Sequence, residues 1–159
     1  MENVFLGLGA NLGNSYKNIL KALELIGSME NVKGVRSSSF YKTSPVSSIK
    51  QKDYLNLVCQ IKTDLEPKKL LTKLQKIEVT LGKTIKGKEE PRLIDIDILF
   101  FGNKDIDIDG LTIPHPRWQE RLFVLVPLQE ISPTITLPDE NTIQLQKLIE
   151  QFSSKEPQV

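Results

Sequence analysis

The spacing of apolar residues along the chain predicts four strands and four helices. Apolar and polar positions alternate most cleanly in 54–63, as they do in a strand, and recur with helical spacing in 67–81. Pro67 suits a first helical turn and Gly82 a helix end, while Asn14 or Ser15 is expected to cap the first helix. The predicted strands are 4–9, 35–41, 54–63 and 94–101, and the predicted helices are 16–26, 67–81, 123–131 and 142–152.

Three of these elements are expected to have one apolar face. The first helix is expected to carry Tyr16, Ile19, Leu20, Leu23 and Ile26 on one face. In 54–63 one face carries Leu55, Leu57, Cys59 and Ile61, and the other carries Tyr54, Asn56, Val58 and Gln60. In 94–101 the even positions Ile94, Ile96, Ile98 and Phe100 are apolar, while the odd positions begin with Asp95 and Asp97.

The order of elements is β, α, β, β, α, β, followed by additional C-terminal helices, which is typical of the ferredoxin-like α+β class. In that fold two helices cover one face of an antiparallel sheet, and the other face stays available for a site. The length of 159 residues and the hydrophobic content of 39% indicate a single domain that spans 1–159.

Overall charge excludes some kinds of partner. The formal net charge is +1, so neither nucleic acid nor an anionic membrane is expected, and no obligate protein partner is indicated. The N-terminus lacks the pattern of a signal peptide and no stretch is long enough to span a bilayer, so we expect a cytoplasmic protein. The single cysteine, Cys59, is expected to be a core residue and not a nucleophile.

Asp95 and Asp97 are the first candidates for chemistry. On one side of a strand they lie roughly 6.5 to 7 Å apart, which lets two carboxylates share magnesium ions that also hold a polyphosphate. The alternative is that both face water on an edge strand. Asp105, Asp107 and Asp109 alternate equally well between Gly102 and Gly110, and there we expect a solvated hairpin without a metal.

The run 114–121 is the second candidate, because it places His115, Arg117 and Arg121 beside prolines that stiffen the backbone. Such donors suit a triphosphate, and the alternative is a basic surface turn. The glycines of 7–13 do not have dinucleotide-binding spacing, and the sequence has neither a P-loop nor a protein-kinase signature. Any ATP site must therefore be of another type.

Four segments occur in a characteristic order: 9–13 (GANLG), 53–56 (DYLN), 91–99 (PRLIDIDIL) and 114–125 (PHPRWQERLFVL), with 38–43 (SSFYKT) between the first two. Together they resemble the 6-hydroxymethyl-7,8-dihydropterin pyrophosphokinase family of folate biosynthesis. The resemblance spans most of the chain and implies a ferredoxin-like fold. It also implies transfer of pyrophosphate from ATP to the pterin alcohol, with two Mg²⁺ ions as cofactor and AMP as the second product.

The resemblance also assigns site residues. Asp95 and Asp97 would hold the metal ions, and Tyr54 and Phe123 would sandwich the pterin while Asn56 reads its polar edge. Glu78, by its position alone, would be unremarkable on a helix surface. The implied catalytic set is Arg92, Asp95, Asp97, His115 and Arg121. The implied ATP site is Glu78, Lys83, Arg92, Ile98, Thr112, His115 and Arg121, and the implied pterin site is Gly9, Thr43, Pro45, Val46, Tyr54, Asn56 and Phe123.

The sequence departs from the family pattern at several positions. Lys83 stands where arginine is usual, 89–90 (EE) where Trp-Gly is usual, and Gly110 and Pro116 where some members have arginine and tyrosine. These departures concern loop closure and nucleotide affinity. The alternative function is a non-catalytic ferredoxin-like small-ligand-binding or regulatory module, or a structural interaction domain.

Overall fold

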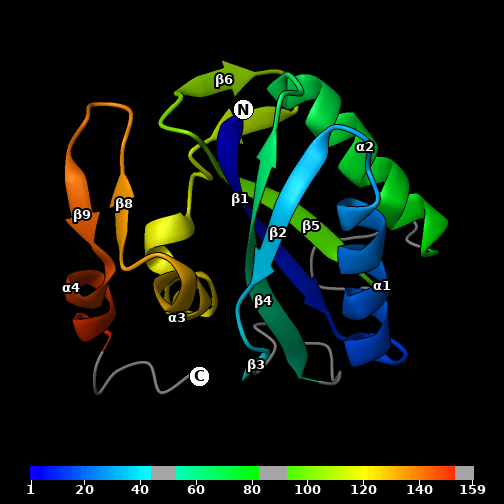
Figure 1. Ribbon diagram of the computed structural model, residues 1–159. Coiled ribbons are helices and arrows are strands. Elements are labelled where there is room, and N and C mark those ends of the chain that lie inside the picture. The colour runs from blue at the N-terminus through cyan, green and yellow to red at the C-terminus, as the bar shows by residue number, and fades with distance from the viewer. Residues whose placement is uncertain (44–52, 83–92, 153–159) are drawn as a thin grey trace.

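The computed structural model describes residues 1–43, 53–82 and 93–152. The first part of the fold consists of β1 (Glu2–Ala10), α1 (Ser15–Gly27), β2 (Val32–Ser37), β3 (Tyr41–Thr43), β4 (Tyr54–Thr63), α2 (Pro67–Thr80) and β5 (Asp95–Phe101). Within these ranges the main sheet is antiparallel, in the order β2-β4-β1-β5, and β3 pairs with the start of β4. Helices α1 and α2 cover one face of the sheet (Figure 1). The predicted ferredoxin-like α+β fold is confirmed.

The main core lies between the sheet and these two helices. Asn14 caps α1, because its side-chain oxygen accepts a hydrogen bond from the backbone N of Lys17 at 3.1 Å, and Pro67 opens α2. Most of the apolar side chains predicted from 54–63 and 67–81 are buried in this core, namely Leu57, Cys59, Ile61, Leu70, Leu74 and Ile77, and the others, Leu55, Leu71 and Leu81, are partly buried against it. On the predicted apolar face of α1, Ile19 and Ile26 are buried, whereas Tyr16 and Leu20 are exposed, with exposed fractions of 55% and 41%.

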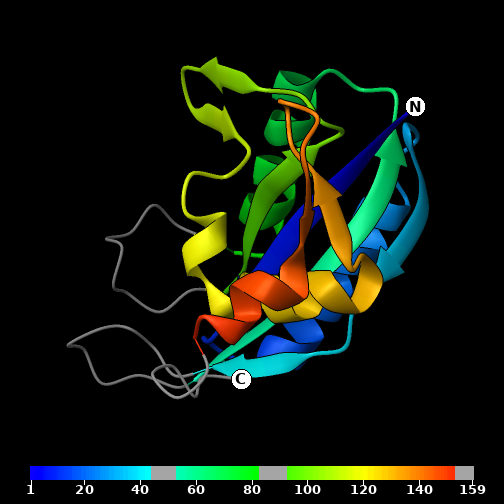
Figure 2. The ribbon, with the colours of Figure 1, turned by 90° about the vertical axis from the view of Figure 1, so that its left-hand side faces the viewer.

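A second layer covers part of the sheet face that was expected to stay open. It consists of α3 (Leu122–Ile131), the hairpin of β8 (Thr134–Thr136) and β9 (Thr142–Gln144), and α4 (Leu145–Glu150) (Figure 2). Val124, Leu125 and Leu128 of α3 form a second core with Phe5 and Val58 of the sheet. The helix predicted over 142–152 is therefore shorter, because its first three residues form a strand that pairs with β8.

A β-bulge corrects the predicted faces of β5. Leu6 pairs with Ile98 whereas Phe5 pairs with Phe100, so Leu99 is an extra residue on its strand. The alternation of faces shifts by one residue at this point. Phe100 therefore packs in the second core, and Phe101 takes the place in the main core that the sequence pattern assigns to Phe100.

The remaining segments are short. The strand predicted over 35–41 is divided, because β2 ends at Ser37 and β3 begins at Tyr41. The predicted hairpin around Gly110 is present as β6 (Ile106–Ile108) and β7 (Leu111–Ile113). No helix in the described part of the chain is both long and apolar enough to cross a membrane.

Candidate active site

The polar end of the sheet face that α3 leaves uncovered carries the candidate site. On this face of β1 the side chains run from Phe5, which packs in the second core, to Gly7 and Gly9, which have none. Gly9 pairs with Asn56 of β4 on one side and with Asp95 of β5 on the other. Two residues earlier on β1, Gly7 pairs with Asp97 of β5. The sheet thus places two carboxylates and a carboxamide on either side of a stretch of β1 that has no side chains on this face.

Asn56 and Thr43 form a buried polar pair at this end. The Asn56 Nδ2 donates to the Thr43 Oγ1 at 2.9 Å, and the two residues are only 7% and 6% exposed. The Asn56 side chain lies over the backbone of Gly9, since a Cβ atom added there would meet its Oδ1 at 2.7 Å. Glycine at position 9 is therefore what gives the Asn56 carboxamide its place.

Asp95 and Asp97 lie on the same face of β5, as the sequence predicts. Asp97 is exposed and Asp95 is partly buried. Between them the buried Ile96 packs into the main core, which holds the strand against the helices. The two carboxylates therefore lie on the same sheet face as Asn56, the face opposite α1 and α2.

Glu78 is not a helix-surface residue. It is only 7% exposed, and its Oε2 accepts a hydrogen bond from the backbone N of Ile96 at 2.7 Å. The carboxylate thus contacts the strand between Asp95 and Asp97. A signal for its burial is present in the sequence, because Leu70, Leu74 and Ile77 define a helical stripe that continues to position 78.

His115 and Arg121 are electrostatic neighbours of Asp97. Burial lowers the pKa of His115, Asp97 raises it, and the positive charges of Arg121 and Arg117 lower it. Burial also lowers the pKa of Arg121, while Asp97 raises it, and the guanidinium stays protonated near neutral pH. The fold therefore brings together Asp97, His115 and Arg121, which are separated by up to 24 residues in the sequence.

Hydrogen bonds fix the orientation of His115. Its backbone N donates to the carbonyl of Leu99, the bulge residue of β5, at 3.0 Å. The backbone N of Arg117 donates to the His115 Nδ1 at 3.3 Å. Since Nδ1 is the acceptor, the proton of the neutral imidazole lies on Nε2, which is then a donor for an anionic ligand.

Arg121 lies just before α3 and over the ring of Phe123, with its Cζ 5.5 Å from the ring centroid. Phe123 is partly buried against the second core, and Tyr54 begins β4 beside Thr43, with which it pairs. Arg117, by contrast, is exposed and forms an ion pair with Glu120 at 3.5 Å. Arg121 is therefore the arginine of this loop that lies partly buried beside Asp97.

The donor set suits a magnesium ion that is bound mainly through a ligand. Within the described ranges, no group of three or more His, Cys, Asp and Glu side chains could hold a metal ion by itself. Mg²⁺ prefers one or two carboxylates and completes its shell with water and phosphate oxygens. Asp95 and Asp97, with the cationic Arg121 nearby for the phosphates, fit this mode of binding.

Other predicted residues have different surroundings. The side chain of Ile98 is 4% exposed and lies in the main core, where it is not available to a ligand. The Thr112 hydroxyl lies 3.4 Å from the Asp107 Oδ1 across the hairpin of β6 and β7. Four predicted site residues lie outside the described residues: Pro45, Val46, Lys83 and Arg92.

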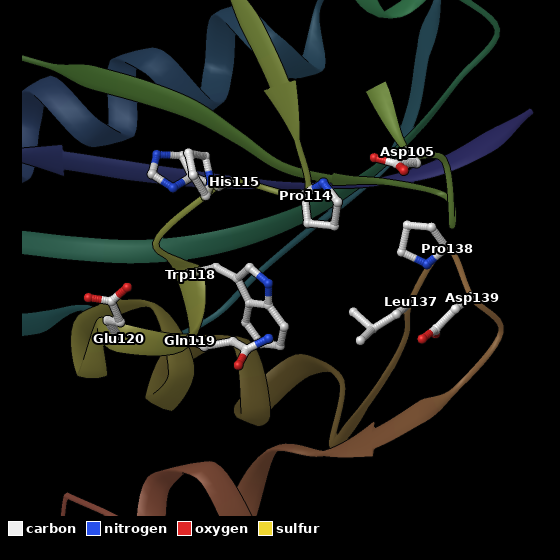
Figure 3. Close-up of a pocket in the computed structure, with 10 residues that line it drawn as sticks. Asp105, Pro114, His115, Trp118, Gln119, Glu120, Leu137, Pro138 and Asp139 are labelled. Atoms are coloured by element: carbon white, nitrogen blue, oxygen red, sulfur yellow. The ribbon is translucent and has the colours of Figure 1, made fainter. Parts of the chain in front are cut away.

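A cavity of about 510 Å³ lies on one side of His115 (Figure 3). Trp118 and Leu137 contribute apolar walls, while Asp105, Glu120 and Asp139 contribute carboxylates. These carboxylates repel a triphosphate, and Asp95, Asp97 and Asn56 do not line the cavity. The candidate phosphate site is therefore beside Asp97 and not in this cavity.

Comparison with known proteins identifies the family. A sequence model described as 7,8-dihydro-6-hydroxymethylpterin-pyrophosphokinase (HPPK) matches residues 5–133. The chain is 39% identical over 153 residues to the 2-amino-4-hydroxy-6-hydroxymethyldihydropteridine pyrophosphokinase of Haemophilus influenzae, covering 96% of this chain and 94% of that protein. It is 41% identical over 132 residues to the Bacillus subtilis protein of the same name, covering 82% and 79%.

Some relatives are much longer. The chain is 43% identical over 137 residues to the folic acid synthesis protein fol1 of Pneumocystis carinii, covering 86% of this chain but only 18% of that protein. A crystal structure of Plasmodium falciparum HPPK-DHPS shares the fold, with a TM-score of 0.74 at 17% identity, and covers 97% of this chain and 46% of that one. The family match over 5–133 and the near full-length bacterial relatives show that this chain belongs to the 7,8-dihydro-6-hydroxymethylpterin-pyrophosphokinase family.

Proposed function

We propose that the protein transfers pyrophosphate from ATP to 6-hydroxymethyl-7,8-dihydropterin in a magnesium-dependent reaction of folate biosynthesis. Membership of the family makes the chain a pyrophosphokinase, which argues against the non-catalytic module. The observation that carries the finer proposal is the arrangement of Asp95 and Asp97 on the sheet face opposite α1 and α2, with His115 and Arg121 beside Asp97.

Asn56, Thr43 and Gly9 are proposed to bind the pterin. The carboxamide of Asn56 is held by Thr43 over the flat backbone of Gly9, which leaves its polar atoms near a planar ligand with donors and acceptors. Tyr54 and Phe123 are aromatic residues from β4 and α3, and they are proposed to stack on the two faces of the ring.

His115 and Arg121 are proposed to bind the triphosphate beside the aspartate pair. The Nε2 proton of neutral His115 and the guanidinium of Arg121 donate to phosphate oxygens. Asp95 and Asp97 would hold Mg²⁺, which would supply positive charge to neutralise and orient the phosphates. The hydroxymethyl oxygen attacks the β-phosphorus and releases its proton to solvent. The bond from that phosphorus to the oxygen shared with the α-phosphate breaks, and AMP leaves with that oxygen.

The nucleotide product tests this proposal. The protein is incubated with ATP, magnesium and the reduced pterin alcohol, and the nucleotides are separated by chromatography. AMP is expected to accumulate in equal amount to the pterin consumed, with none formed when the pterin is omitted. Stoichiometric ADP, or AMP formation that does not depend on the pterin, contradicts the proposal.

A further inference from the structure

Glu78 is a buried carboxylate of α2 that is hydrogen-bonded to β5, the strand that carries Asp95 and Asp97. Its Oε2 accepts from the backbone N of Ile96 at 2.7 Å, and Ile96 is the residue between Asp95 and Asp97. Glu78 is 7% exposed and Ile96 is 5% exposed. A charged acceptor at this distance makes a strong hydrogen bond, and burial protects that bond from competition with water.

The contact completes the backbone pairing of β5. In the described sheet β5 pairs only with β1, so the opposite edge of β5 has backbone N–H groups that β1 cannot accept. In an antiparallel ladder successive N–H groups alternate between the two sides of a strand. Because the Ile96 N–H donates to Glu78, this alternation directs the N–H groups of Asp95 and Asp97 towards β1, where they pair with Gly9 and Gly7.

The segment from Asp95 to Asp97 is consequently held on three sides. β1 binds one edge, Glu78 binds the other, and the Ile96 side chain is fixed in the main core. The directions of both carboxylates depend on this backbone, since each is joined to it by only two side-chain torsions. A metal or phosphate site needs its ligands within about 0.5 Å of the productive geometry.

We propose that Glu78 is a positioning residue, whose carboxylate acts through the Ile96 amide to hold Asp95 and Asp97 in the geometry that binds a divalent cation. This inference rests on the proposed function, because it assigns the pair to cation binding. Glu78 would then contact the backbone that carries the metal ligands and not the metal itself. Mutation of residues that orient metal ligands typically lowers metal affinity or activity by about 10–100-fold.

Two substitutions at position 78 distinguish the effect of the hydrogen bond to the Ile96 amide from the effect of the negative charge. Glu78→Gln keeps an oxygen at the distance of the Ile96 amide but removes the charge. Glu78→Asp keeps the charge but withdraws the carboxylate by one methylene group, so it cannot reach Ile96 without movement of α2. If Glu78 acts through Ile96, Glu78→Gln retains Mn²⁺ affinity and kcat, and Glu78→Asp lowers both. If Glu78 acts by its charge on a ligand, the order is reversed.

The experiment measures three properties of each variant. The first is hydrogen exchange of the Ile96 amide by NMR, and the second is Mn²⁺ affinity with a non-hydrolysable ATP analogue, which requires no turnover. The third is kcat and KM for ATP. Val79→Ala is the matched control, because Val79 is the next residue of α2 and is 68% exposed. Melting temperatures show whether each variant is folded.

For Glu78→Asp we expect faster Ile96 exchange, about 10–100-fold weaker Mn²⁺ binding and a kcat lower by a similar factor. Glu78→Gln and Val79→Ala are expected to stay within about threefold of the parent. The proposal is overturned if Glu78→Gln lowers Mn²⁺ affinity and kcat as much as Glu78→Asp does. It is also overturned if Glu78→Asp lowers Mn²⁺ affinity while the exchange rate of the Ile96 amide is unchanged. A parent protein that binds Mn²⁺ as expected but forms no AMP contradicts the proposed function and leaves the positioning role standing.

Discussion

The substitution Gly9→Ala tests how the sheet holds the Asn56 carboxamide. A Cβ atom at position 9 would lie 2.7 Å from the Asn56 Oδ1, which is closer than real Cβ contacts allow, so the Asn56 side chain must move. Movement distorts or breaks its 2.9 Å hydrogen bond to Thr43. Both residues are buried, so the polar atoms that lose their partner do not regain it fully from water.

The size of the effect follows from two opposing terms. A buried polar group that loses its hydrogen bond costs about 1–3 kcal/mol of the free energy of unfolding. Alanine in place of glycine in a strand restores roughly 0.5–1 kcal/mol, because it reduces the freedom of the unfolded chain. The net loss is about 1 kcal/mol, which lowers the Tm of a protein of this length by about 2–4 °C.

Gly7→Ala is the matched control. Gly7 lies two residues earlier on the same face of β1, but a Cβ atom there would meet the Leu99 Cδ1 at 3.5 Å, an ordinary van der Waals distance. Its Tm is expected to stay level or rise by about 1–4 °C. Thermal unfolding is followed by circular dichroism, and pterin affinity by calorimetric titration in the presence of the ATP analogue. Gly9→Ala is expected to weaken pterin binding by about tenfold or more, which corresponds to about 1.4 kcal/mol. Equal Tm and pterin affinity in the two variants would refute this reasoning.

Three further predictions concern single side chains. In the metal-free protein the single histidine, His115, is expected to titrate by NMR below the ordinary pKa of about 6.5, because burial lowers its pKa. Asp97→Asn should lower this pKa further and Arg121→Gln should raise it, and shifts of the opposite sign would show that these charges do not face His115. Arg121→Ala is expected to weaken binding of the ATP analogue by tenfold or more, whereas Arg117→Ala, at an exposed arginine paired with Glu120, should change it little; equal losses would contradict the assignment. Burial raises the pKa of Cys59 to about 12, so its thiol should not react with a disulfide reagent at pH 8 until the protein is unfolded, and rapid reaction of the native protein would contradict its place in the core.

Alternation and helical spacing are sufficient to predict β4 and α2. The reason is that β4 and α2 each bury one regular stripe against the same core, so local pattern and tertiary packing agree. Asp95, Asp97 and Asn56 were placed on one sheet face by the same rule. What brings them together with Gly9 is the strand order, which follows from the ferredoxin-like arrangement.

The pattern failed where a contact from elsewhere in the chain changes the local rule. Strict alternation cannot reveal the bulge at Leu99, which moves Phe100 to the opposite face. Tyr16 has the helical spacing of a core residue but lies at the surface against Phe40, with ring centroids 4.7 Å apart. Glu78 is buried although it is a charged residue, because its carboxylate accepts a hydrogen bond from the Ile96 amide of β5. The sequence of α2 alone does not reveal this contact.

One comparison of variants tests the central claim, that Asp95 and Asp97 form the centre of pyrophosphate transfer. Asp95→Asn, Asp97→Asn and Asp107→Asn are assayed for pterin-dependent AMP formation, and the Tm of each is measured in parallel. Asp107 is an exposed residue of the hairpin of β6 and β7 and is the control. The first two variants are expected to lose nearly all turnover and keep a Tm close to that of the parent, because the carboxylates act on the ligand and not on the core. Asp107→Asn is expected to keep nearly full activity. Turnover that survives in Asp97→Asn, or a loss in Asp107→Asn as large as in the other two, would contradict the account.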